Sequence, residues 1–133
     1  MLTSLSIKNY ALIESVQLRF KKGFTVITGE TGAGKSILLG ALGLITGKRA
    51  DSASAGVASE KCIVEGVFDI EDYELKSFFQ ENDLDYESNT IVRRELLPSG
   101  KSRAFINDTP VTLSQLSVLG ARLVDIHLSL IHI

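Results

Sequence analysis

Residues 24–36 read Phe-Thr-Val-Ile-Thr-Gly-Glu-Thr-Gly-Ala-Gly-Lys-Ser, and this stretch decides the fold. Its first five residues form a short β-rich run, typical of a strand buried on both faces. Its last eight, Gly29-Glu30-Thr31-Gly32-Ala33-Gly34-Lys35-Ser36, fit the phosphate-loop pattern G-x-x-x-x-G-K-[ST]. A helical run follows from residue 36 to about residue 45, and Gly47 is placed to end it. Strand, glycine-rich loop and helix therefore stand in the order that the motif requires.

Each fixed position of this loop has a physical reason. The glycines allow the main chain to approach phosphates, so that successive N–H groups form an anion-binding nest beside a helix N-terminus. Lys35 brings a positive charge to the β- and γ-phosphates, and the Ser36 hydroxyl is the expected Mg²⁺ ligand. The alternative is a glycine-rich turn with a solvated lysine, since the pattern alone arises by chance in about one chain of this length in 200. The context favours a nucleoside triphosphate site, with ATP and Mg²⁺ as its ligands.

Composition sets the outer limits of the function. The 133 residues fit one domain or a piece of a larger one, and 44% apolar with 23% charged residues is ordinary for a globular protein. The formal net charge of -2 gives no overall attraction to nucleic acid, so any such contact needs a local basic patch. No signal-peptide pattern opens the sequence, and the apolar stretch at residues 37–45 is too short to span a bilayer.

Strand patterns surround the phosphate loop. Residues 4–7 and 16–20 predict an antiparallel pair, with residues 8–10 in the connection. Residues 62–70 predict a further strand. Residues 90–97 and 102–106 predict a hairpin around the turn Pro98-Ser99-Gly100-Lys101, with a second tight turn at Asn107-Asp108.

Helical spacing of apolar residues is found in two further places. Residues 73–81 predict a helix with Asp72 as a possible N-cap. Thr112 is placed to cap a helix over residues 113–119, and residues 123–126 predict the start of another strand. Cys62, Phe78 and Phe79 are expected in the core, and His127 and His132 have no partners at metal-ligand spacing.

Several segments together resemble the RecN family of bacterial DNA repair proteins, which belongs to the SMC-like ATPases. The resemblance rests on the opening Leu-Ser-Ile-Lys-Asn-Tyr-Ala-Leu-Ile-Glu, the phosphate loop and the segment Ser-Arg-Ala-Phe-Ile-Asn at residues 102–107. It continues through residues 47–51, 110–113 and 123–127, and so covers nearly the whole chain.

The resemblance implies an α/β fold: the N-terminal lobe of an ABC-type ATPase head, with a mixed sheet, residues 24–28 in its centre, and an antiparallel β sub-lobe. Residues 1–127 look like the first half of such a head. Residues 128–133 depart from the family because they contain no Gln where a Q-loop is expected, and we interpret them as a truncation or read-through. No Leu-Ser-Gly-Gly motif occurs, and residues 67–69 and 123–125 are only short approximations to a Walker B strand.

The implied function is ATP binding in a protein that repairs DNA double-strand breaks in the bacterial cytoplasm, associated with the nucleoid. The implied partners are the C-terminal half of the same head, a second head bridged by two ATP molecules, and DNA. Because water-positioning residues are missing, this chain alone is expected to bind ATP without hydrolysing it. The alternatives are a nucleotide- and partner-binding module without catalysis, and a small P-loop kinase or GTPase, which the absence of Asn-Lys-x-Asp disfavours.

Two basic clusters are candidates for phosphate or DNA contact. Lys48 and Arg49 follow the phosphate-loop helix, where they could equally serve as an ordinary solvated helix end. The second cluster lies on the predicted hairpin, near the cations of the N-terminal pair, and solvated strand faces are the competing interpretation. Its members are Arg93, Arg94, Lys101 and Arg103, with Lys8, Arg19, Lys21 and Lys22 on the N-terminal pair.

Overall fold

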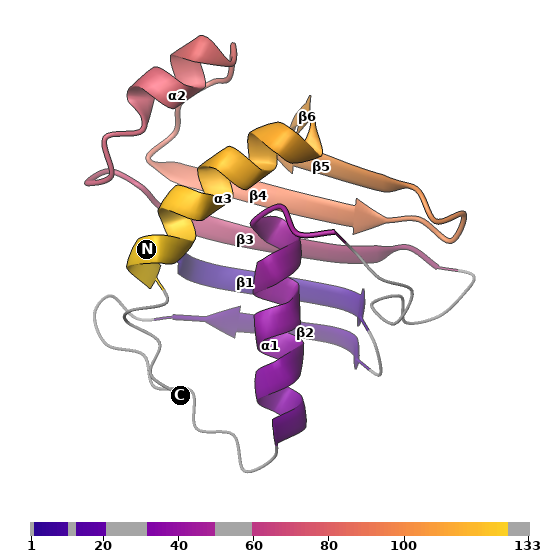
Figure 1. Cartoon of the computed structure of the whole chain (residues 1–133). Coiled ribbons are helices and arrows are strands. Elements are labelled where there is room, and N and C mark those ends of the chain that lie inside the picture. The colour runs from indigo at the N-terminus through magenta and orange to yellow at the C-terminus, as the bar shows by residue number, and fades with distance from the viewer. Residues whose placement is uncertain (1, 11–12, 21–31, 50–59, 128–133) are drawn as a thin grey trace.

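The computed structural model describes residues 2–10, 13–20, 32–49 and 60–127. Six strands and three helices occupy these residues (Figure 1). In chain order they are β1 (Leu2–Tyr10), β2 (Ile13–Arg19), α1 (Gly32–Ile45), β3 (Cys62–Asp69), α2 (Lys76–Glu81), β4 (Asn89–Leu96), β5 (Ser102–Ile106), β6 (Thr109–Val111) and α3 (Leu113–His127).

The strands form one sheet in the order β2-β1-β3-β4-β5-β6, and every described pairing is antiparallel. The predicted N-terminal pair is confirmed, with Ile7 opposite Val16, and so is the hairpin of β4 and β5, with Arg94 opposite Ala104. β3 joins these two hairpins into a single sheet. The predicted strand at residues 24–28 lies outside the described residues, so the mixed character of the whole sheet stays a prediction.

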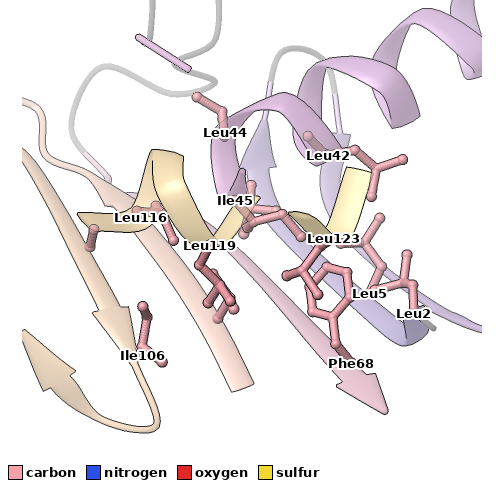
Figure 2. Packing of buried hydrophobic residues seen from close by; sticks show 14 of the residues in the cluster. Leu2, Leu5, Leu42, Leu44, Ile45, Phe68, Ile106, Leu116, Leu119 and Leu123 are labelled. Atoms are coloured by element: carbon pink, nitrogen blue, oxygen red, sulfur yellow. The ribbon is translucent and has the colours of Figure 1, made fainter. Parts of the chain in front are cut away.

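The core lies between one face of the sheet and the helices α1 and α3, which both cross that face (Figure 1). We call this the inner face of the sheet and the opposite one the outer face. Strand alternation sends every second side chain inward, as the pattern of β3 shows: Cys62, Val64, Gly66 and Phe68 are buried. Figure 2 shows buried side chains of both helices close to these strands: Leu42 and Ile45 come from α1, and Leu116, Leu119 and Leu123 come from α3.

Outside the phosphate-loop helix, three sequence-based boundaries were wrong. Residues 8–10 belong to β1, where Lys8 pairs with Ser15 and Tyr10 with Ile13, so the connection to β2 is shorter than expected. α2 starts at Lys76, with no side-chain cap, because the backbone turns first: the N–H of Tyr73 donates to the Ile70 carbonyl and Glu74 has a φ of 53°.

The third correction concerns α3, which runs on to His127 where a strand was expected over residues 123–126. Leu123 continues the buried stripe of Leu116 and Leu119 at helical spacing, and burial of that stripe against the sheet favours helix. The predicted cap is confirmed, because the Thr112 hydroxyl accepts the Gln115 N–H at 3.1 Å.

Candidate nucleotide-binding site

The phosphate-loop motif runs into the N-terminus of α1. The helix begins at Gly32, four residues earlier than the sequence indicated, so the backbone of Gly32, Ala33, Gly34, Lys35 and Ser36 forms its first turn. Gly29, Glu30 and Thr31 lie outside the described residues. The first four N–H groups of a helix have no partner within it, and they carry the positive end of its dipole. No acidic residue stands in this first turn to compete with an anion.

Apolar packing holds α1 against the inner face. Ala41 and Ile45 are fully buried, and Leu38, Leu42 and Leu44 are nearly so. Gly47 ends the helix as predicted: its φ is 96°, its N–H donates to Leu44, and the Lys48 N–H donates to Gly43 at 3.0 Å. This is a Schellman ending, in which the chain turns sharply out of the helix.

Side chains from two other elements contact this end of α1. The Nη1 atom of Arg94, on β4, donates to the Leu44 carbonyl at 2.9 Å and to the Lys48 carbonyl at 2.8 Å. The Ser117 hydroxyl, on α3, donates to the Gly47 carbonyl at 3.1 Å. Sequence patterns do not indicate these bonds, because the partners are separated by 46 to 70 positions in the chain.

Lys48 and Arg49 are exposed beside a cavity of about 330 Å³. Among the residues that the structure describes, neither side chain forms an ion pair. The helix-end carbonyls are already bonded to Arg94, Ser117 and backbone N–H groups, so these two cations are not needed to cap α1. The lining residues of the cavity are Tyr10, Leu39, Gly40, Gly43, Leu44, Lys48 and Arg49.

The hairpin cations are distributed differently from the sequence expectation. Arg94 is only 1% exposed, so its guanidinium is not available to a DNA backbone, and its role here is internal. Arg93 lies on the outer face, where it contacts Glu65 at 3.7 Å, Glu95 at 3.3 Å and Asp108 at 3.2 Å. It also lies over the ring of Phe105, with 4.3 Å between the guanidinium carbon and the centroid.

The remaining hairpin cations are exposed. Arg103 reaches Glu95 at 3.7 Å with half of its side chain in solvent, and Lys101 lies in the turn. Because carboxylates offset Arg93 and Arg103, the outer face is a mixed rather than a basic surface.

The structure also places the two Walker B candidates and part of the C-terminal segment. Residues 123–125 lie within α3, so they do not form a Walker B strand. Asp69, at the end of β3, accepts the N–H of Glu71 at 3.2 Å. The side chain of His127, and all of residues 128–133, lie outside the description. Across the described ranges no group of three His, Cys, Asp or Glu side chains is arranged to hold a metal, and no described helix is long and apolar enough to cross a membrane.

Comparisons with known proteins agree with this geometry. A family model described as an AAA domain matches residues 4–124. The DNA repair protein RecN of Vibrio cholerae is 44% identical over 96% of this chain, and that of Bacillus subtilis is 41% identical over 96%. The chain spans only 23% and 22% of the lengths of these two relatives.

Solved structures extend the likeness to the fold. A structure from work on ATP-driven dimerization and DNA-stimulated activation of SMC ATPases matches 91% of this chain and 78% of its own, with a TM-score of 0.71 and 23% identity. The recombination mediator protein RecF matches 87% of this chain and 29% of its own, with a TM-score of 0.68 and 18% identity. At these identities the likeness concerns the fold alone.

Proposed function

Because the chain belongs to the AAA-domain family and aligns along 96% of its length with RecN proteins, we propose that it is an ATP-binding segment of an SMC-like head. The head acts in the repair and recombination of broken DNA, as the names of these relatives suggest. The observation that carries the proposal is the phosphate-loop motif at the start of α1. Neither a kinase nor a GTPase reading has a comparable observation behind it.

The site residues have distinct roles in this proposal. The backbone N–H groups of residues 29–36 enclose the phosphates, and the N-terminus of α1 adds its partial positive charge. Lys35 neutralises the β- and γ-phosphates, and Ser36 ligates Mg²⁺. Magnesium held by the Ser36 hydroxyl would offset the negative charge of the phosphates. These groups bind and orient a nucleotide, but none of them positions an attacking water.

The proposed partners follow from that incompleteness. The remaining part of the head supplies the water-positioning groups, and a second head, bridged by ATP, completes each site. DNA is held by the assembly, with Lys48, Arg49, Lys101 and Arg103 as exposed phosphate contacts, since backbone contacts need charge and no base code. We place the protein in the bacterial cytoplasm, associated with the nucleoid.

Binding of Mg-ATP to the purified chain tests this function. Lys35→Ala should weaken binding by at least about tenfold, because charge-assisted contacts to phosphate are strong. Lys48→Ala, at the other end of the same helix, is the matched control and should bind as the unaltered chain does. Steady-state phosphate release should stay at the Lys35→Ala background. Equal nucleotide affinity of the two variants would exclude the site, and turnover well above background would show a complete enzyme.

A further inference from the structure

The Arg94 guanidinium is buried without a carboxylate. Its residue is 1% exposed, and within residues 2–10, 13–20, 32–49 and 60–127 no Asp or Glu pairs with it. Its polar contacts are the carbonyls of Leu44 and Lys48, at 2.9 and 2.8 Å, and the Ser102 hydroxyl, 2.7 Å from Nε. Burying a charge in this way is costly unless its hydrogen bonds are made, so this arrangement needs a reason beyond filling the core.

The two carbonyls explain how the charge is tolerated. Leu44 lies in the last turn of α1, so its oxygen belongs to the negative end of the helix dipole, and the Lys48 carbonyl follows the turn at Gly47 and adds a second acceptor. Burial lowers the pKa of Arg94, but a guanidinium still keeps its proton in a protein. The helix end therefore acts as the counter-charge, and β4 becomes directly bonded to the end of α1.

These bonds also fix the axial position of α1, which the apolar contacts restrain only weakly. Leucine and isoleucine side chains press α1 onto the sheet, but dispersion contacts are weakly directional and permit small axial shifts. The two carbonyls stand on opposite sides of the turn at Gly47, and one nitrogen reaches both, so an axial shift of the helix must lengthen at least one bond. Hydrogen bonds weaken steeply as they lengthen or bend.

A rigid helix transmits its axial position from one end to the other. α1 has 14 residues and is therefore about 21 Å long, at 1.5 Å per residue. We propose that Arg94 is a positioning residue for the nucleotide site: by clamping the C-terminal end of α1 it sets where Gly32–Ser36 present their N–H groups at the other end. The inference rests on the proposed function, because it presumes that phosphates bind at that N-terminus.

The test uses a graded set of variants in the whole chain. Ser102→Ala removes one of the three hydrogen bonds. Arg94→Lys keeps the charge on a shorter side chain that lacks the Nε donor to Ser102, and Arg94→Met removes all three bonds. Val92→Ala is the matched control, because it alters a fully buried residue on the same strand and the same face without touching the clamp.

Affinity for Mg-ATP is measured by calorimetry well below the melting temperature of each variant. We expect the dissociation constant to rise about twofold in Ser102→Ala and about tenfold in both Arg94→Lys and Arg94→Met, since misplacement of about 1 Å is costly at phosphate sites. Val92→Ala should lower the Tm yet bind as the unaltered chain does. Ser102→Ala keeps the test open if Arg94→Met does not fold.

Amide hydrogen exchange without nucleotide supplies the second readout. Ser102→Ala and Arg94→Lys should accelerate exchange in α1 selectively, whereas Val92→Ala should accelerate it across the sheet. If the unaltered chain binds no nucleotide while α1 loosens selectively, the proposed function fails and the clamp stands. If Arg94→Lys and Ser102→Ala bind ATP normally, or if α1 exchanges no faster in them, the proposal is overturned.

Discussion

Arg93 and Arg94 are neighbours in one strand, yet they belong to different regions of the molecule. Arg94 points to the inner face, is 1% exposed and donates to main-chain carbonyls of α1. Arg93 points to the outer face, where its side chain is 24% exposed and lies among Glu65, Glu95 and Asp108. Strand alternation alone separates them.

The difference teaches which charges hold this fold together. On the outer face Arg93 lies among three carboxylates, so the loss of one partner is compensated by the other two. On the inner face, removal of the Arg94 guanidinium takes a charged donor from the Lys48 carbonyl and leaves the Leu44 carbonyl with only the 3.3 Å bond from the Gly47 N–H. An arginine should therefore contribute much more to the free energy of unfolding on the inner face than on the outer face.

The largest expected effect on stability comes from removing the buried arginine of this pair. Arg94→Met should lower the free energy of unfolding by about 3 kcal/mol, because the carbonyls of Leu44 and Lys48 both lose a charged donor. Arg93→Met should cost about 1 kcal/mol or less, including its contact with Phe105. Urea denaturation of both variants measures the difference. Equal losses would mean that the buried guanidinium contributes no more than a surface ion pair.

A pair of glycines makes the same comparison without charge. Gly47 and Gly100 have φ values of 96° and 91°, so an alanine at either suffers similar backbone strain of about 1 kcal/mol. A Cβ at Gly47 would lie 2.6 Å from the Cα of Ser117 on α3, whereas nothing lies within 4 Å at Gly100. Gly47→Ala should therefore cost about 3 kcal/mol, strain and overpacking together, and Gly100→Ala about 1 kcal/mol. Thermal unfolding of the two variants decides it, and similar Tm values would show that the α1–α3 contact is not tight.

Local patterns predicted the parts of the fold that local chemistry controls. The hairpin of β4 and β5, the Gly47 ending and the Thr112 cap all depend on residues a few positions apart, and all three are confirmed. The length of α3 was missed, because the predicted helix ended at residue 119, just before Gly120. In the structure Gly120 instead lies against Thr46, so close that any side chain would overlap its carbonyl.

The candidate site shows the same difference between local features, which could be predicted from sequence, and long-range contacts, which could not. The motif at residues 29–36 could be read from sequence because its chemistry is contained in eight consecutive residues. The burial of Arg94 could also have been predicted, since Val92, Arg94 and Leu96 are alternate residues of β4 and therefore point to the same face. Its partners were not, because carbonyls 46 and 50 positions away leave no trace in side-chain patterns.

A smaller effect is expected from the carboxylate at the centre of the outer face. Glu95 lies within 3.8 Å of Lys61, 3.3 Å of Arg93 and 3.7 Å of Arg103. Glu95 is only 7% exposed, but the side chains of its three partners reach solvent. Glu95→Gln should therefore cost about 1 kcal/mol at low ionic strength and less in 1 M salt, because salt screens the partly exposed contacts. Asp108→Asn is the control: its side chain is 81% exposed and, in the part of the chain that the structure describes, forms an ion pair with Arg93 only, so its effect should be barely measurable. A loss of unfolding free energy in Glu95→Gln that does not depend on salt would mean that the ion pairs of the outer face are as well shielded from water as the contacts of the inner face.

The smallest effect at neutral pH concerns Cys62, which shares the inner face with Arg94 but carries no charge there. It is 1% exposed, and burial raises its thiol pKa from 9.0 to about 11. Because the neutral thiol is the form that the core accepts, its contribution to stability is fully present below pH 9 and is lost as pH rises through 11.

At pH 8 the thiolate fraction in the folded chain is about a hundredfold lower than in the unfolded chain. Iodoacetamide should therefore alkylate Cys62 in the native protein at least about a hundredfold more slowly than in the urea-unfolded protein. Mass spectrometry of the time course measures both rates in one chain, and no variant is needed because this is the sole cysteine. Native and unfolded rates that agree within about tenfold would contradict the inner face as a closed, water-free layer.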